Sequence, residues 1–488
     1  MKCSEVSFKK ILTDNSLLRF DAEYYNPEYV EAERSVKIKP HRELRNLISV
    51  LTDYHANGSY EILRNNVQLL DYPDYALMIR TVDFERDDFE HDVKYISEHA
   101  YNFLKKTQIF GKEIIINKIG NAGKVYIVPP LNKKVSLGMN QFMIRPTKDI
   151  VGGYLYLYLI SKYGSRLLQQ KITGAVPLSI DKESVRSILV PILDYGFQDR
   201  IDRILNTHFA LRAKSKELYS QAEQILLSEL GLLDWKPKHQ FSFVKNFSDT
   251  KSVDRIDADY FQPMYDELIE KIKQYRNGYE KLGYLVSIKK CIEPGSEAYQ
   301  ENGIPFLRVS NLSKFGINND NQQYISESLY EELKNYQPQK GEILLSKDAT
   351  PGIAFYLNNE PEKMIPSGGI LRLKVKDVKA IYPEYLTLVL NSVVVQRQIE
   401  RDIGGSVINH WLVDQVKNAL IPILPESIQK DISDKIADSF LKRDQSVKLL
   451  DIAKRGVEMA IERNEKEAEK WLKDEVNHAG SSVHLESG

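Results

Sequence analysis

The sequence predicts an α+β protein built from two pseudo-symmetric mixed α/β modules that are separated by two long helices. Three observations predict this fold class. The chain repeats its own motifs in order, short apolar runs bounded by turn residues fill most of each copy, and each copy ends in a long stretch with helical apolar spacing. With 488 residues and 42% hydrophobic residues, each half is large enough to bury its own core.

The internal duplication is visible in several motifs that recur at a nearly constant separation along the chain. Arg19-Phe20-Asp21-Ala22-Glu23-Tyr24 returns as Arg255-Ile256-Asp257-Ala258-Asp259-Tyr260. Tyr95-Ile96-Ser97-Glu98 returns as Tyr324-Ile325-Ser326-Glu327, and Val190-Pro191-Ile192-Leu193 returns as Ile421-Pro422-Ile423-Leu424. Because the order is kept and the separation changes little, we expect two copies of one fold. Two copies suit a ligand with two half-sites.

Strands and short helices are predicted at equivalent places in the two copies. Runs rich in Ile, Val and Tyr and bounded by Gly, Asn or Pro predict strands. These runs are residues 76–79, 113–116, 124–128 and 142–144 in the first copy, and 305–309, 342–345 and 370–373 in the second. Residues 153–170 and 384–401 predict helices. Asn26-Pro27 and Gln262-Pro263 predict helix starts, because proline suits the first helical position and Asn is a good cap.

Two long stretches with apolar residues at spacings of three, four and seven predict the long helices. The stripe residues are Ile201, Leu205, Phe209, Leu218, Ala222, Ile225 and Leu226, and then Ile432, Ile436, Phe440, Val447, Leu450, Val457 and Ile461. At about 1.5 Å per residue these helices are longer than one small domain can cover, so we expect the two stripes to pack on each other. Two independent helical hairpins are the alternative.

These patterns divide the chain into five predicted parts. The parts are a first module at 1–194, a central long helix at 195–235, a second module at 236–425, a C-terminal long helix at 426–476, and a disordered tail at 477–488.

Composition limits the compartment and the mode of binding. Cys3 and Cys291 are too few for a disulfide framework, which indicates a reducing, cytoplasmic setting. The N-terminus lacks the apolar core of a signal peptide, and no run approaches the roughly 18 apolar residues of a membrane span, so no membrane partner is expected. A net charge of −1 argues against a polycation that coats nucleic acid, but it allows locally basic surfaces.

In these motifs and their order the chain resembles the specificity (S, HsdS) subunit of type I restriction–modification systems. The resemblance is carried by the paired Arg-x-Asp-Ala-[Glu/Asp]-Tyr starts and by Gly174-Ala175-Val176 and Gly405-Ser406-Val407, each followed by a strand with a proline. Gln198 and Gln429 at the helix starts also match. The resemblance covers nearly the whole chain, and the duplicated arrangement of its motifs makes it specific.

The resemblance implies a non-catalytic subunit of a phage-defence system. It implies two target-recognition domains that each read one half of a bipartite sequence in double-stranded DNA, and an antiparallel coiled coil that sets the half-site spacing. Methyltransferase (M) and restriction (R) subunits are the implied protein partners. No cofactor is expected in this chain, since S-adenosylmethionine, ATP and Mg²⁺ belong to those partners. Many members of the family end soon after the second helix, whereas this chain continues with residues 462–488.

Polar residues in loops at strand ends are the candidates for DNA contact. Arg, Lys, Asn and Gln can make bidentate contacts with base edges, and a glycine turn flanked by lysines can hold a phosphate. A phosphate contact or a solvated side chain is the alternative at each position. The candidates are Arg80, Lys118, Asn121, Lys124, Lys133, Lys134, Asn140 and Gln141 in the first module, and Arg308, Asn311, Lys314, Lys347, Thr350 and Arg372 in the second.

Two short motifs leave open an enzymatic alternative, namely a stand-alone DNA adenine methyltransferase or nuclease. The run 26–29 is similar to the Asn-Pro-Pro-Tyr loop of amino-methyltransferases, but no Gly-rich unit for S-adenosylmethionine follows it. Residues 73–74 with 92–94 are similar to a nuclease site that needs paired carboxylates on Mg²⁺, but the second copy lacks the lysine. The nine histidines show no metal-ligand spacing. A scaffold whose modules bind protein is a third possibility.

Overall fold

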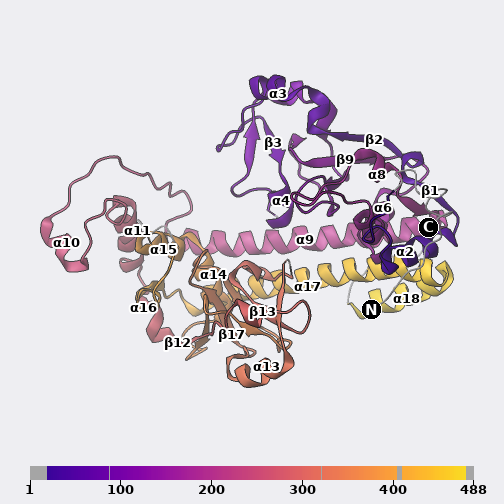
Figure 1. The fold of residues 1–488 in the computed structure, drawn as a ribbon. Helices are drawn as coiled ribbons and strands as arrows, with labels where there is room; N and C mark the ends of the chain where they lie inside the picture. The colour runs from indigo at the N-terminus through magenta and orange to yellow at the C-terminus, as the bar shows by residue number, and fades with distance from the viewer. Residues whose placement is uncertain (1–18, 87, 320, 404–408, 480–488) are drawn as a thin grey trace. The chain divides into compact units, whose positions relative to one another are not determined.

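A computed structural model of the chain describes residues 19–86, 88–319, 321–403 and 409–479 (Figure 1). Its contacts divide the chain into two compact units. Unit 1 contains Met1–Leu211 and Asp444–Gly488, and unit 2 contains Arg212–Arg443. Each unit holds one mixed α/β module together with part of each long helix.

Unit 1 is organised around two four-stranded sheets. The first sheet is antiparallel, in the order β2 (Ile48–Asp53), β9 (Gln141–Pro146), β6 (Ile114–Asn117) and β7 (Val125–Ile127). The second has the order β4 (Lys94–Ile96), β3 (Ala76–Ile79), β8 (Val135–Leu137) and β5 (Gln108–Ile109), with β3 and β8 parallel. A separate antiparallel pair joins β1 (His41–Glu43) to β10 (Leu189–Pro191).

Unit 2 has the same topology in its corresponding strands. The first sheet has the order β12 (Val286–Lys290), β20 (Ile370–Val375), β17 (Glu342–Ser346) and β18 (Ala354–Tyr356). The second has the order β16 (Gln323–Ile325), β13 (Ile304–Leu307) and β19 (Ile365–Pro366), again with one parallel pair. β11 (Tyr279–Lys281) pairs with β21 (Leu420–Pro422), and β14 (Leu312–Ser313) with β15 (Gly316–Ile317). The predicted fold class, with two copies of one mixed α/β module, is therefore confirmed.

The inner strands β6 and β17 of the first sheets are buried on both faces. In unit 1, Ile114 and Ile116 face the core formed with the helices, whereas Ile115 faces the second sheet. In unit 2, Ile343 and Leu344 divide in the same way. Burial on both faces explains why these strands are continuous apolar runs without alternation. It also places polar side chains at the strand ends, in the connecting loops.

The repeated Arg-x-Asp motif ties the start of the module to the end of a helix in unit 1. Arg19 pairs with Asp21 at 2.7 Å, and the Asp21 carboxylate accepts a hydrogen bond from the backbone N–H of Tyr24 at 3.0 Å. The Arg19 guanidinium also donates to the carbonyls of Gln170 and Ile172, at 3.3 and 3.1 Å. The hydrogen bond from Arg19 holds the pKa of Asp21 below its usual value.

Unit 2 repeats this arrangement with its own copy of the motif. Arg255 pairs with Asp257 at 2.7 Å, and Asp257 accepts from the backbone N–H of Tyr260 at 3.0 Å. The Arg255 guanidinium donates to the carbonyl of Asp402 at 2.8 Å. The motif therefore recurs in the sequence because, in each unit, it joins the start of the module to the end of a helix.

The predicted helices at 153–170 and 384–401 are each divided into two by a serine. In unit 1, α6 (Gly152–Ile160) precedes α7 (Lys162–Gln170), and in unit 2, α14 (Pro383–Asn391) precedes α15 (Val393–Ile403). The Ser161 hydroxyl donates to the carbonyl of Tyr158 at 2.6 Å, and the Ser392 hydroxyl donates to that of Val389 at 2.8 Å. Serine side chains compete with the helical backbone for such carbonyls, which interrupts the helix.

The predicted helix starts at Pro27 and Pro263 are confirmed. Proline opens both α2 (Pro27–Lys37) and α11 (Pro263–Lys273), and the Asn26 side chain accepts from the backbone N–H of Glu28 at 3.0 Å. The remaining short helices are α3 (Tyr60–Asn66), α4 (Thr81–Arg86), α5 (Glu98–Phe103) and α8 (Lys182–Arg186) in unit 1, and α10 (Phe247–Val253), α12 (Leu282–Leu285), α13 (Glu327–Leu333) and α16 (Val413–Asn418) in unit 2.

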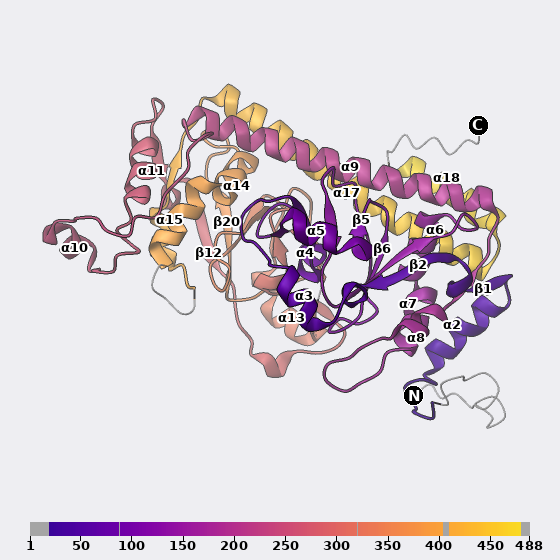
Figure 2. The same cartoon turned by 90° about the horizontal axis from the view of Figure 1, so that it is seen from above.

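The long helices are α9 (Tyr195–Glu229) and α17 (Glu426–Glu462), which lie side by side in both views of the fold (Figures 1 and 2). In unit 1, the Ser446 hydroxyl donates to the His208 carbonyl at 2.9 Å. In unit 2, the Ser439 hydroxyl donates to the Ser215 carbonyl at 2.7 Å. Because numbering rises along one helix as it falls along the other, the helices are antiparallel. The predicted packing of their two stripes on each other is confirmed.

The apolar seam of α17 departs from the predicted stripe at one position. Val447 is half exposed, whereas Leu449 and Ala453 are fully buried in the unit 1 core. The helical repeat of about 3.6 residues drifts away from a strict spacing of seven, so the position seven residues after Phe440 turns outward.

The chain after α17 forms a separate helix, where the sequence predicted one helix continuing to 476. Asn464 interrupts it by accepting a hydrogen bond from the backbone N–H of Glu467 at 3.0 Å, which caps α18 (Glu465–His478). α18 buries Ala468, Leu472 and Val476 in the unit 1 core. Residues 480–488 of the predicted tail lie outside the described residues. In the ranges that are described, no helix has the length and apolar character that a membrane crossing requires.

Candidate nucleic-acid interface

Two exposed loops of unit 1 join into one surface at the end of β6. The loop 118–124 contacts the loop 172–180 through a backbone bridge between Ile119 and Ser179. The backbone N–H of Gly120 also donates to the carbonyl of Leu178 at 3.2 Å. Gly120 and Gly123 have φ angles of 83° and 79°, a conformation that favours glycine. We call residues 118–124 and 172–180 the loop pair. It includes Gly174-Ala175-Val176, and Val176 is almost fully exposed.

Two lysines converge on one carboxylate beside the loop pair. Lys118 lies 3.1 Å and Lys182 lies 2.8 Å from the carboxylate of Asp53, and both ammonium groups lie over the ring of Phe142. The lysine side chains are 29% and 34% exposed, so solvent still reaches both. Lys182 was not among the predicted contact residues, because it opens a short helix that is distant from the strand ends in sequence.

The charge on Asp53 is stabilised by its neighbours. Burial raises the pKa of this carboxyl, but hydrogen bonds from Lys182 and Lys118 lower it further than burial raises it, and the pKa lies below its usual value. Asp53 therefore stays ionised at neutral pH and cancels part of the positive charge of the two lysines. The cluster of Asp53, Lys118 and Lys182 is a basic patch with a built-in counterion.

Asp53→Asn is expected to strengthen binding to DNA of unrelated sequence. The substitution leaves Lys118 and Lys182 free to contact a phosphate, so the slope of log affinity against log salt should steepen by about 1. Retention of a non-target duplex over a salt series measures this slope. Asp149→Asn is the matched control, because Asp149 is an exposed carboxylate of unit 1 that pairs with Arg42 at 3.8 Å. An equal change in both variants would contradict a local role for the cluster.

Arg80 and Arg308 occupy equivalent positions directly after β3 and β13. The Arg80 backbone N–H donates to the Asp83 side chain at 2.7 Å, and the Arg308 N–H donates to that of Asn311 at 3.2 Å. Each guanidinium donates to a carbonyl of the following loop at 2.6 Å. Arg80 also pairs with Asp83 at 2.7 Å. The same backbone arrangement therefore contains the carboxylate of Asp83 in unit 1 and the amide of Asn311 in unit 2.

The prediction that Arg372 contacts DNA is wrong. Its side chain is buried and forms a bidentate pair with Glu342, at 2.8 and 3.0 Å, while a further nitrogen donates to the carbonyl of Asn335. Arg145 and Glu113 form the equivalent pair in unit 1. An ion pair that recurs in both copies belongs to the shared framework. The presence of the same two residue types in both copies of the sequence could have indicated that Arg372 has a structural role.

Two other predicted contacts are also buried. The Asn311 side chain is fully buried, accepting from the Arg308 N–H and donating to the carbonyl of Asn318 at 3.2 Å. Gln141 opens β9 opposite Asn117 of β6 and is fully buried between the strands. Neither side chain reaches a DNA groove without a change in the fold, so these two predictions are corrected as well.

The remaining predicted residues of unit 1 are exposed, apart from the partly buried Lys124. The Asn121 amide donates to Glu85 at 2.8 Å, and Lys124 lies 5.8 Å from the ring centroid of Tyr126. Lys134 lies 3.9 Å from the ring centroid of Tyr75. Lys133 donates to the carbonyl of Phe89, and Asn140 is exposed with a φ of 64°.

In unit 2, the loop after β17 carries two of the predicted residues. Lys347 pairs with the neighbouring Asp348, whose carboxylate also contacts His410 at 2.8 Å, and Thr350 is exposed. Lys314 lies 5.3 Å from the ring centroid of Phe315. The Trp411 backbone N–H donates to the Lys347 carbonyl at 2.7 Å, as the N–H of Ile180 donates to that of Lys118 in unit 1. Gly405-Ser406-Val407 lies outside the described residues.

The residues of the enzymatic alternative serve local structure. The Asn26 side chain caps α2, as described above. Asp92 pairs with Arg86, and Lys94 pairs with Asp71, so the nuclease-like residues contact different partners. In the part of the chain that the structure describes, no three His, Cys, Asp or Glu side chains gather as a group that could hold a metal ion.

Comparison with known proteins identifies one domain of the chain. Residues 278–445 match the model of the type I restriction modification DNA specificity domain. A search of curated proteins found no match. Among solved structures, the S subunit of a type I system from M. genitalium is 12% identical, with 89% of this chain and 95% of that chain covered and a TM-score of 0.35. The HsdS subunit from Thermoanaerobacter tengcongensis is 14% identical, with 90% and 95% covered and a TM-score of 0.25.

The matched segment spans most of the unit 2 module, so this part of the chain is similar to a type I restriction modification DNA specificity domain. The family recognised from the sequence is thereby confirmed for residues 278–445, which match its DNA specificity domain.

Proposed function

We propose that the chain is the specificity subunit that reads a bipartite double-stranded DNA target for a type I restriction–modification complex. Residues 1–194 and 236–425 are the two target-recognition domains, and each reads one half-site. The long helical regions at 195–235 and 426–476 set the spacing between the half-sites. The chain performs no catalysis. Methyltransferase and restriction subunits supply S-adenosylmethionine, ATP and Mg²⁺ chemistry in the cytoplasm.

The observation that carries this proposal is the pairing of one framework with two sets of loop side chains. The strand order, the Arg–Asp junction and the Arg–Glu pair recur in both units. At equivalent exposed loop positions the side chains differ, as with Asn121 after β6 and Thr350 after β17. Phosphate contacts position a protein on DNA while base contacts specify the sequence, so two frameworks with different loops suit an asymmetric two-part target.

Mapping methylated adenines tests this proposal. The chain is expressed with the type I methyltransferase encoded beside it, in a host without adenine methylation of its own, and the methylated sequences are determined. We expect one motif with two defined halves and an unread spacer. Asn140→Ala should relax one half only, and Thr350→Ala the other half only. A continuous motif, or relaxation of both halves by either variant, would contradict the proposal.

The enzymatic alternative is tested with the lone chain. Purified protein is assayed for binding of S-adenosylmethionine and for Mg²⁺-dependent cleavage of DNA. We expect neither activity without the partner subunits. Turnover by the lone chain that is lost in Asn26→Ala, or in Asp92→Asn, would favour the alternative.

A further inference from the structure

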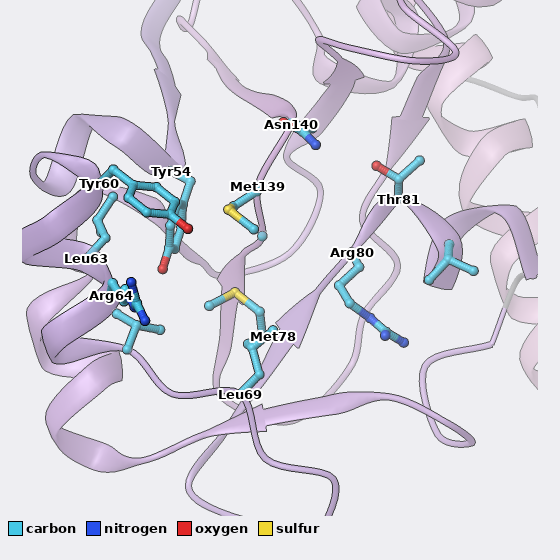
Figure 3. A pocket seen from close by; sticks show the side chains of 13 residues that line it. Tyr54, Tyr60, Leu63, Arg64, Leu69, Met78, Arg80, Thr81, Met139 and Asn140 are labelled. Carbon is cyan, nitrogen blue, oxygen red and sulfur yellow. The ribbon is translucent and has the colours of Figure 1, made fainter. Parts of the chain in front are cut away.

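Unit 1 contains a cavity of about 400 Å³ between α3 and the ends of β3 and β8 (Figure 3). Tyr54, Tyr60 and Leu63 form the wall on the α3 side. Met78 and Met139 lie opposite this wall. Tyr60 and Met139 are exposed, whereas Tyr54 and Met78 are buried, so the cavity is open to solvent and closed at its base.

The cavity presents a few polar groups in an otherwise apolar lining. The Tyr54 side chain is only 8% exposed, and its hydroxyl makes no hydrogen bond with the residues that the structure describes. Burial raises the pKa of Tyr54, so the hydroxyl stays protonated and can donate. Arg64 lies on the same wall (Figure 3). The Tyr54 hydroxyl is not one of the buried unpaired groups, so it is open to the cavity and is available to donate to a ligand there.

The mouth of the cavity adjoins the candidate DNA-contact surface. Arg80 and Asn140, which were both predicted to contact DNA, are among its lining residues. The carbonyl of Asn140 accepts a hydrogen bond from the backbone N–H of Lys118 at 2.7 Å, and Lys118 belongs to the cluster with Asp53 and Lys182. A ligand in the cavity would therefore lie next to positions where phosphates are expected.

The cavity is built by a segment that differs between the two copies. The connection from β2 to β3 spans residues 54–75 in unit 1, whereas the corresponding connection from β12 to β13 in unit 2 spans only 291–303. The longer segment contains α3, which supplies Tyr60, Leu63 and Arg64. A longer segment that is present in only one of the two copies is typical of an element that determines specificity, and it is not part of the shared framework.

We propose that this cavity receives one unstacked nucleobase from the half-site that unit 1 contacts, a proposal that rests on the proposed function. A nucleobase has flat apolar faces and a polar edge, and it is attached to an anionic backbone. The rings of Tyr54 and Tyr60 with Met78 and Met139 suit the faces, and aromatic side chains bind the faces of all bases. The Tyr54 hydroxyl, the Arg64 guanidinium and the Asn140 amide suit the edge, while Lys118 and Lys182 suit the adjoining phosphates.

The test uses the assembled complex with its methyltransferase partner and the target sequence found by mapping. A fluorescent base analogue, 2-aminopurine, replaces each base of the unit 1 half-site in turn. We expect one position to show a several-fold change in fluorescence on binding that depends on Tyr60 and Tyr54. Tyr60→Ala and Tyr54→Phe should diminish this change at that position alone. A base that the methyltransferase extrudes should also respond, but independently of Tyr60.

Tyr72→Ala is the matched control, because Tyr72 is an exposed tyrosine of the same segment that does not line the cavity. It should leave the response intact. Specific binding without any unstacked base, or an unstacked base that is indifferent to Tyr60 and Tyr54, would overturn the inference and leave the proposed function standing. Failure of the wild-type complex to bind any sequence specifically would overturn both.

Discussion

Glu342→Gln is expected to destabilise unit 2 by about 3–5 kcal/mol, because it leaves the Arg372 guanidinium buried without its counterion. The two side chains are 1% and 2% exposed, so water cannot replace the lost carboxylate. The loss should appear as a lower unfolding midpoint in chemical denaturation, with the slope of the transition unchanged.

The equivalent pair in unit 1 provides the control for this prediction. Glu113 is buried, but Arg145 is 31% exposed, so solvent can take over part of its stabilisation. Glu113→Gln should therefore cost less, about 1–2 kcal/mol, within the range for leaving a partly hydrated group unsatisfied. Equal losses in the two variants would show that burial of the arginine does not control the cost.

A double substitution distinguishes an uncompensated charge from a general loss of packing. Glu342→Met combined with Arg372→Met removes both charges and keeps much of the volume. Replacing a whole buried ion pair by apolar residues is often neutral or stabilising. We therefore expect the double variant to be more stable than Glu342→Gln alone.

Removing one heptad from each long helix is expected to change the spacing of the DNA half-sites and to leave their sequences unchanged. The deletions remove residues 208–214 and 440–446, so the His208–Ser446 contact is lost from both helices together and the Ser215–Ser439 contact keeps its partners. One heptad shortens a helix by about 10 Å. That length corresponds to about three base pairs at roughly 3.4 Å per step of one strand.

The rotation of DNA makes the expected result more specific. DNA turns once in about 10 base pairs, whereas a heptad deletion nearly preserves the angular position of each helix face. The shorter site should therefore be preferred but bound more weakly than the parent site. Selection from a library of half-sites with varied spacers measures the preference. Removing the heptad from α9 alone breaks the pairing and should instead destabilise the protein. An unchanged preferred spacing after the matched deletion would contradict the proposal that the long helices set the half-site spacing.

The sequence predicted the repeated framework well, because repetition separates structural positions from variable ones. The starts at Pro27 and Pro263 and the packing of the two apolar stripes followed from local chemistry and apolar spacing. The breaks at Ser161 and Asn464 were missed, because a single hydrogen bond between a side chain and the backbone overrides an otherwise continuous helical pattern.

The candidate site was only partly predictable. A basic or amide residue after a strand can point to solvent or to a buried partner, and the choice depends on distant residues. Arg372 and Asn311 turned inward because Glu342 and the loop carbonyl of Asn318 accept from them. Lys182 joined Lys118 only because both meet Asp53, a contact between distant parts of the chain that carries no local signal.

The division of the chain also orders events during synthesis. Unit 2 is one uninterrupted stretch, Arg212–Arg443, nested inside unit 1, and it can fold as soon as that stretch leaves the ribosome. Unit 1 must wait, because Leu449, Ala453 and Leu472 of its core are translated later. Residues 1–211 of unit 1 are therefore synthesised first, but unit 1 completes its core last. Until residues 444–479 are synthesised, the apolar surface of that first segment requires protection from aggregation.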